Sequence, residues 1–199
     1  MKAVMPSVRP EILAWRKRTG ADRWDEMWEG VLHMPPMPNS EHQDLEWALE
    51  TYLRTHWARR LRAKVFHQIN VASPGGWPDD YRIPDLVLLK PDRFHVNRSD
   101  YFDGGPNVVV EIHSPGDEAR EKLGFYAAIG VSEVWIIDRD TKAPEIHVLQ
   151  EGRYETKAPG AGGWLASGET GLELKAGEAG RLSVRLAGDE STRADLPEV

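Results

Sequence analysis

The chain of 199 residues contains no cysteine. Without a thiol, the protein cannot form a disulfide, a thiolate zinc site, an iron–sulfur cluster or a cysteine nucleophile. This composition fits a reducing cytoplasm, and we expect the protein there. No window approaches the roughly 18 consecutive apolar residues of a membrane-spanning helix. The N-terminal residues also lack the apolar core and cleavage site of a signal peptide, so we expect neither secretion nor a membrane partner.

Positive charge is in the minority. The chain has 25 Lys and Arg against 32 Asp and Glu, a formal net charge of −7. This balance argues against a protein that coats nucleic acid generally, although it allows a local basic groove. Hydrophobic residues make up 40% of the chain, which excludes an intrinsically disordered protein. We expect a single domain over residues 1–187, followed by a polar, frayed tail over 188–199.

Three short apolar runs predict buried strands at residues 83–89, 107–112 and 133–138. A predicted helix over 117–129, ended by Gly130, lies between the last two strands. A strand, a helix and a strand in this order imply a parallel crossover within one sheet. The predicted fold class is therefore α/β or α+β, with a central mixed sheet against which the helix packs.

The remaining pattern predicts shorter or less regular elements. We expect a helix over 9–18, a strand or hairpin over 24–34 with a turn near Gly30, a helix from Asn39 or Ser40 to about Trp57, a strand over 63–71, a loop over 91–105, a hairpin of 144–149 and 153–157, and strands near 171–175 and 181–186. The eight Trp residues mainly indicate core and interface packing. A basic cluster between Arg54 and Lys64 could be a solvated helix end or a phosphate-contacting patch.

Two carboxylates interrupt buried strands. Asp85 lies in the run 83–89, and Glu111 lies near the end of the run 107–112. Each could face solvent at a strand end, pair with an arginine, or bind a metal ion, because an unpaired buried carboxylate is costly. Lys122 belongs to the helix that folds back over the sheet, so its ammonium can approach Glu111. Two carboxylates and a lysine suit Mg²⁺-dependent hydrolysis of a phosphodiester bond.

Further motifs surround these three residues. They are Pro84-Asp85-Leu86-Val87, the run Val109-Val110-Glu111-Ile112-His113-Ser114-Pro115, Lys122, Tyr126, Gly130-Val131, Val134-Trp135-Ile136-Ile137-Asp138, and upstream Glu29-Gly30-Val31-Leu32, Met34-Pro35-Pro36 and His42. In combination they resemble the Uma2-type restriction endonucleases, which belong to the PD-(D/E)xK nuclease superfamily. The resemblance covers about residues 20–150.

This resemblance implies a restriction-endonuclease-like PD-(D/E)xK fold, with a central mixed sheet flanked by helices, and Mg²⁺-dependent cleavage of DNA. It assigns Asp85 and Glu111 as metal ligands and Lys122 as the catalytic lysine, moved from the strand to the helix. The backbone carbonyl of Ile112 is the expected third protein ligand, because the residue after a ligating carboxylate exposes its main chain at the strand end. We expect Mn²⁺ to substitute for Mg²⁺.

The sequence departs from the superfamily pattern at His113, which occupies the strand position where a lysine is usual. His113 shares a strand face with Glu111, so it could assist in the site or be an ordinary edge histidine. The resemblance also places Glu29 and His42 near the site as supporting residues. Otherwise, Glu29 would be a solvated turn residue and His42 a helix residue facing solvent.

Three classes of function follow from these observations. The first is a metal-dependent endonuclease that acts on DNA. The second is a nuclease fold with weak or no catalysis that serves as a DNA- or protein-binding module, which the net charge of −7 favours mildly. The third is a structural or regulatory partner that binds no nucleic acid. The many Trp and apolar residues in a small acidic domain also predict a homodimer.

Overall fold

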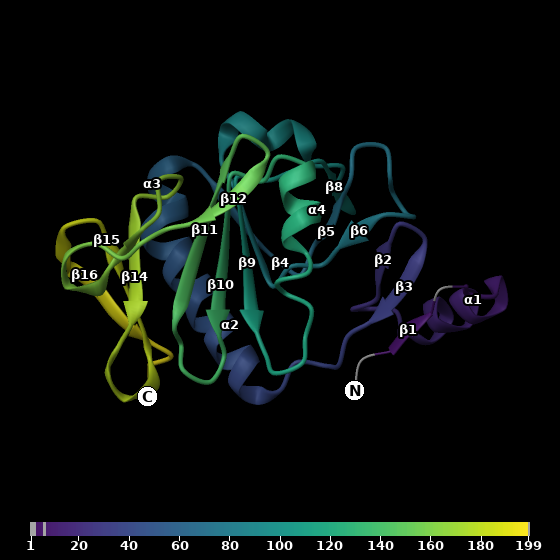
Figure 1. Cartoon of the computed structure of the whole chain (residues 1–199), viewed down its shortest axis with the longest axis horizontal. Helices are drawn as coiled ribbons and strands as arrows, with labels where there is room; N and C mark the ends of the chain where they lie inside the picture. The colour runs from purple at the N-terminus through teal and green to yellow at the C-terminus, as the bar shows by residue number, and fades with distance from the viewer. Residues whose placement is uncertain (1–2, 6, 199) are drawn as a thin grey trace.

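The computed structural model describes residues 3–5 and 7–198. Its centre is a six-stranded mixed sheet in the order β12-β11-β10-β9-β7-β4 (Figure 1). The strands of this sheet are β4 (Lys64–His67), β7 (Leu86–Leu89), β9 (Val108–His113), β10 (Glu133–Asp138), β11 (Pro144–Gln150) and β12 (Arg153–Thr156). Because β7, β9 and β10 lie side by side, the prediction that these three apolar runs share one sheet is confirmed.

The β9–β10 pair is parallel and is connected through helix α4 (Leu123–Ala128), which confirms the predicted crossover. The helix is shorter than predicted, because residues 117–122 are not helical and 119–122 form a turn. Asp117 explains the delay: its carboxylate accepts hydrogen bonds from the backbone N–H groups of Ser114 and Ala119, and this turn comes before the helix. Lys122 is therefore the residue immediately before α4.

Helix α2 (Ser40–Tyr52) packs on one face of the central sheet, and α4 packs on the opposite face (Figure 1). Asn39 caps α2 as predicted, since its side chain accepts a hydrogen bond from the backbone N–H of His42 at 3.0 Å. The helix continues through a π-helical segment, Leu53–Ala58, into α3 (Arg59–Leu61). Trp57 and Trp135 are both fully buried in the core between α2 and the sheet.

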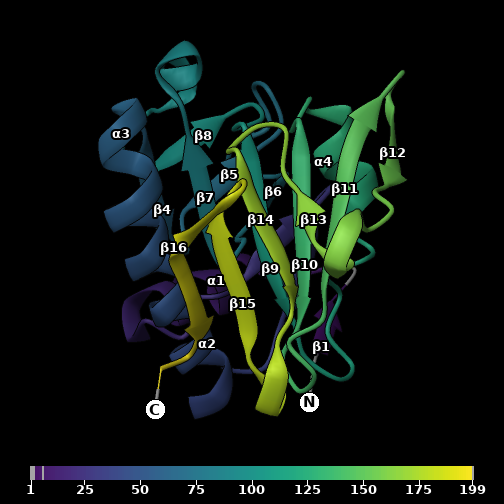
Figure 2. The ribbon, with the colours of Figure 1, turned by 90° about the vertical axis from the view of Figure 1, so that its left-hand side faces the viewer.

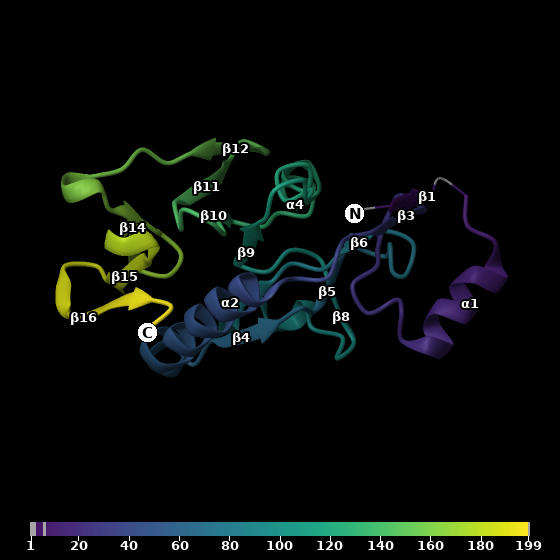
Figure 3. The same cartoon turned by 90° about the horizontal axis from the view of Figure 1, so that it is seen from below.

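A second six-stranded sheet lies beside the first, in the order β1-β3-β2-β6-β5-β8. Its strands are β1 (Ala3–Met5), β2 (Glu26–Trp28), β3 (Val31–Met34), β5 (Asn70–Ala72), β6 (Tyr81–Arg82) and β8 (Tyr101–Asp103). Helix α1 (Pro10–Thr19) lies at the outer end of this sheet, as Figure 3 shows from below.

Two predictions in this region are wrong in detail. The single strand expected over 63–71 is two strands, β4 and β5, which belong to different sheets. Gln68, with a φ of 47°, separates them, because a left-handed residue breaks an extended run. The loop expected over 91–105 contains a 3-10 helix, Pro91–Val96, and strand β8.

A four-stranded antiparallel sheet closes the chain and packs on the α2 side of the central sheet (Figure 2). Its strands are β13 (Leu165–Ala166), β14 (Leu172–Ala176), β15 (Leu182–Leu186) and β16 (Asp189–Leu196). The frayed tail expected over 188–199 is therefore wrong for the residues of β16. Ala194 and Leu196 pair with Val184 and Leu182 of β15, and their alternation with charged residues hid the strand in the sequence. Within the described chain, no helix has the length and apolarity needed to cross a membrane.

Candidate active site

A cavity of about 260 Å³ opens where the two six-stranded sheets meet the N-terminal turn of α2. Its walls come from β2, the residues before β7, the end of β9 and the turn that precedes α4. Its lining includes the titratable residues Glu26, His42, Asp85, Glu111 and Lys122 and the candidate backbone ligand Ile112. The structure thus gathers the predicted carboxylates and lysine in one cavity, although 37 residues of sequence separate Asp85 from Lys122.

Lys122 and Glu111 meet on the α4 side of the cavity. The Lys122 Nζ atom lies 3.1 Å from Oε2 of Glu111 and 2.8 Å from Oε1 of Glu26. The Tyr126 hydroxyl donates to the other Glu111 oxygen, Oε1, at 2.5 Å. Glu111 is therefore held by two partners that come from the segment 122–126, as expected for a helix that folds back over its own strand.

Burial and the neighbouring charges shift the pKa values of Glu111 and Lys122. Burial raises the pKa of Glu111 above its ordinary value, and although Lys122 opposes the shift, Asp85 and Glu26 add to it. Burial alone would lower the pKa of Lys122, but the Glu111 and Glu26 carboxylates outweigh burial and hold it above its usual range. Lys122 is consequently a cation surrounded by carboxylates, a state suited to stabilising negative charge in the cavity.

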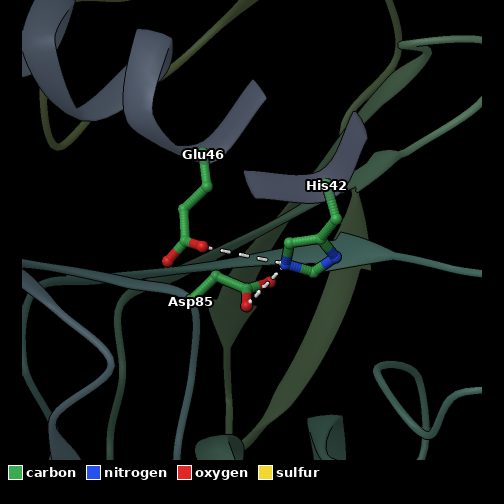
Figure 4. Close-up of side chains that lie close together, drawn as sticks. All are labelled: His42, Glu46 and Asp85. Atoms are coloured by element: carbon green, nitrogen blue, oxygen red, sulfur yellow. Dashed lines mark hydrogen bonds and ion pairs between the residues drawn. The ribbon is translucent and has the colours of Figure 1, made fainter. Parts of the chain in front are cut away.

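Asp85, His42 and Glu46 form a second group on the α2 side (Figure 4). The His42 Nε2 atom lies 2.9 Å from Oδ1 of Asp85 and 3.9 Å from Oε2 of Glu46. His42 and Glu46 are four residues apart, so they occupy the same face of α2. One ligand atom from each of the three residues lies within 4.8 Å of the others, close enough to hold one metal ion.

The end of β9 holds the second oxygen of Asp85. The Oδ2 atom of Asp85 accepts a hydrogen bond of 2.6 Å from the backbone N–H of Ile112. Leu86, the first residue of β7, pairs with Val110, so Ile112 extends past the start of that strand. In an antiparallel ladder the N–H and C=O groups of one residue point to the same side. The Ile112 carbonyl therefore points toward the same edge as Asp85.

Glu46 carries an incompletely satisfied carboxylate. Its side chain is buried, and Gln68 Nε2 donates to Oε2 at 3.4 Å. Oε1 lies 3.0 Å from Nδ1 of His67, but the two atoms are not aligned for a hydrogen bond, so Oε1 has no hydrogen-bond partner among the described residues. Burial, with repulsion from Asp85 and Glu50, raises the pKa of Glu46 to about 9. A buried oxygen of this kind is a ready acceptor for a cation.

Two of the expected site residues lie outside the cavity lining. Glu29 is exposed in the turn between β2 and β3, where its φ is 49°. His113 points to Asp117, with its Nδ1 atom 2.6 Å from Oδ1 of that residue. The His113 side chain is held by this local contact, and Glu29 is an exposed turn residue.

Sequence reasoning missed Glu26 and Glu46. Glu26 lies three residues before Glu29 and alternates along β2 so that its side chain faces the cavity. Glu46 follows His42 by one helical turn, and that spacing could have identified it once His42 was assigned to the site.

Residues 10–184 match the Uma2 family, whose description reads "Putative restriction endonuclease". The chain belongs to the Uma2 family. A solved structure from Anabaena variabilis ATCC 29413, a "putative nuclease belonging to DUF820", is similar with a TM-score of 0.54 and 18% identity. That alignment covers 67% of this Uma2 chain and 74% of the other chain, and at this identity it shows a shared fold. None of the curated proteins matches the chain.

Proposed function

We propose that this Uma2 protein is a Mg²⁺-dependent endonuclease that hydrolyses phosphodiester bonds of DNA on a PD-(D/E)xK-type fold. The observation that carries the proposal is the meeting of Asp85, Glu111 and Lys122 in one cavity between the sheets. Family membership adds support, since the Uma2 description is that of a restriction endonuclease.

The donor atoms of the cavity fit Mg²⁺. Carboxylate and carbonyl oxygens are the ligands that this ion prefers, and Mn²⁺ accepts the same set. Asp85, Glu111 and the Ile112 carbonyl would hold the ion. A second arrangement, through Asp85, His42 and Glu46, is supported by the approach of one ligand atom of each residue to within 4.8 Å of the others. When bound, Mg²⁺ offsets the repulsion among the carboxylates, neutralises phosphate charge and lowers the pKa of water.

The side chains around the cavity then have separate tasks. The Ile112 N–H fixes one oxygen of Asp85, and Tyr126 fixes one oxygen of Glu111. Lys122 supplies a buried positive charge that orients the attacking water and stabilises negative charge as it develops on the phosphate. Glu26, 2.8 Å from Lys122, keeps that ammonium charged and directed into the cavity.

Cleavage of supercoiled plasmid DNA tests this function. The parent protein should nick the plasmid with Mg²⁺ or Mn²⁺ and be inactive in EDTA. Lys122→Ala should lose about 10²–10³ in rate while it keeps most of its metal affinity, and Asp85→Asn should lose both. Lys175→Ala, on β14 of the C-terminal sheet, is the matched control and should cut at the parent rate.

Circular dichroism must first show that each variant is folded, because removing Lys122 leaves two buried carboxylates without their cation. A folded Lys122→Ala protein that cuts as fast as the parent would remove the lysine from the mechanism. A parent protein that binds DNA but does not cut it at any Mg²⁺ concentration would replace the nuclease with the binding-module function that the net charge of −7 favours.

A further inference from the structure

Helix α1 contributes almost nothing to the core. None of its residues is buried, and two of its three large apolar residues, Leu13 and Trp15, are 38% and 52% exposed. Most helices in proteins are stabilised by packing an apolar face against the rest of the molecule. The position of α1 at the outer end of the structure (Figure 3) therefore requires an explanation other than core packing.

The exposed surface of α1 is basic in an acidic protein. Within and next to the helix, Arg9, Lys17 and Arg18 are exposed, and the segment 9–18 contains a single acidic residue, Glu11. The whole chain has a formal net charge of −7, so this surface is a local reversal of sign. Trp15 and Arg18 are both exposed and three residues apart, so they share one face of the helix.

A bidentate salt bridge ties α1 to the wall of the cavity. Arg16 Nε lies 2.5 Å from Oδ2 of Asp25, and Arg16 Nη2 lies 2.6 Å from Oδ1 of the same residue. Asp25 is buried, and its two neighbours in sequence, Trp24 and Glu26, line the cavity. The basic helix is thus held in a fixed relation to the site by a contact that uses one of its own arginines.

We propose that α1 binds the phosphate backbone of a DNA duplex whose scissile phosphate lies in the cavity, an inference that rests on the proposed nuclease function. Arg9, Lys17 and Arg18 would pair with phosphates, and Trp15 would pack against the sugar face of the same strand. Charge distinguishes this occupant from a second copy of the chain. In a two-fold dimer through α1, each basic helix would face its own copy and like charges would meet.

The test compares two triple variants with the same change in charge. The first is Arg9→Ala, Lys17→Ala and Arg18→Ala in α1. The control is Arg59→Ala, Arg60→Ala and Arg62→Ala, in the other basic cluster of the chain, so it also tests whether that cluster is a solvated helix end or a phosphate-contacting patch. This cluster is at the far end of the helix that begins beside the cavity, about 25 Å along its axis from His42. All six residues are exposed, so both proteins should fold, and circular dichroism would verify this.

Affinity for a labelled duplex is measured by fluorescence anisotropy against salt concentration, with Ca²⁺ in place of Mg²⁺ and the duplex verified intact afterwards. The α1 variant should bind at least about tenfold more weakly and lose about 0.9 from the slope of log K against log salt for each phosphate contact removed. The control should stay within about twofold of the parent.

Equal effects in the two variants, or none in α1, would overturn the inference while leaving the nuclease function in place. Sedimentation of the same proteins tests whether a second copy of the chain binds α1 instead. If the α1 variant loses a dimer but keeps its DNA affinity, α1 is an interface between copies and the inference is overturned. A parent protein that neither binds nor cuts DNA would overturn the proposed function, and the inference with it.

Discussion

At the scale of single residues, the environment of Glu46 in the metal-free protein favours the protonated carboxyl group. Its pKa of about 9 in the folded state lies above the ordinary value of 4.5, mainly because the side chain is buried. The folded protein therefore binds one more proton than the unfolded chain between these two values. The contribution of Glu46 to the stability of the folded protein is fully present below about pH 4.5 and is lost as the pH rises toward 9.

Glu46→Gln should consequently stabilise the metal-free protein at alkaline pH. Each pH unit between the two pKa values is worth at most about 1.4 kcal/mol, so we expect a gain of about 1–3 kcal/mol at pH 8, and little difference near pH 4.5. The same substitution should weaken Mn²⁺ binding about tenfold or more. Urea unfolding at several pH values and calorimetric titration with Mn²⁺ measure the two effects.

Asp44→Asn is the matched control, because Asp44 lies on α2 two residues before Glu46 but is exposed. It should change Mn²⁺ binding little. Equal losses of Mn²⁺ affinity in the two variants, or a Glu46→Gln protein that is less stable at pH 8 than the parent, would contradict the role given to the unpartnered oxygen of Glu46.

Glu26 and Glu29 allow a direct comparison between the structure and the sequence. The structure places Glu26 2.8 Å from Lys122, whereas Glu29 is exposed in a turn. Glu26→Gln should therefore reduce the rate of DNA cleavage by about 10²-fold, since Lys122 loses a charged partner that directs it. Glu29→Gln should cut at the parent rate. Single-turnover cleavage measures both, and a defect confined to Glu29→Gln would restore the assignment made from sequence.

The limits of sequence reasoning at this site have a physical origin. Asp85 and Glu111 could be found because a carboxylate in an apolar strand is costly and must have a partner. Lys122 could be found because a helix after a strand folds back over it. Glu26 and Glu29 are both acidic and only three residues apart, so the choice between them depends on where the β2–β3 turn falls.

At the scale of elements, β16 is the clearest difference between expectation and structure. Half of its residues are charged, and only two apolar residues alternate along its second half. Residue 196 is nevertheless buried, and Tyr52 of α2 donates a hydrogen bond of 2.9 Å to the Thr192 carbonyl. The strand is stabilised by its pairing with β15, a long-range contact that a local pattern does not reveal.

Deletion of residues 189–199 should therefore destabilise the protein. The deletion removes a buried leucine and one edge of the C-terminal sheet, which we expect to cost at least about 3 kcal/mol. It also leaves β15 as an unpaired edge, so the shortened protein should aggregate more readily. Urea unfolding and light scattering provide the measurements. A shortened chain with parent stability would support the frayed tail and contradict the role of β16.

The strands that could be predicted are those whose apolar composition requires burial whichever strand they pair with. Residues 107–112 and 133–138 are so apolar that any fold must bury them, and the structure places both at the centre of the main sheet. Residues 63–71 are different, because one left-handed residue, Gln68, divides them between two sheets. A non-glycine residue with positive φ leaves no signal in the apolar pattern.

At the scale of the whole molecule, the homodimer stays a prediction. Trp47 on α2 is 67% exposed, and Met37, which lines the cavity, is 70% exposed, so apolar surface is available close to the site. Sedimentation equilibrium at micromolar concentration should show a dimer, and Trp47→Glu should shift it toward monomer by placing a charge in apolar contact. A parent protein that is monomeric throughout this range would exclude the dimer.

A divalent cation bound in this cavity through Asp85 is the central requirement of the proposed nuclease function. Anomalous diffraction from a crystal soaked in Mn²⁺ tests that claim without requiring catalysis. We predict a peak within about 2.0–2.6 Å of an Asp85 carboxylate oxygen, shared with Glu111 and the Ile112 carbonyl or with His42 and Glu46. Manganese peaks only at other surfaces, or an empty cavity at saturating Mn²⁺, would contradict the assignment of this cavity as a metal-dependent nuclease site.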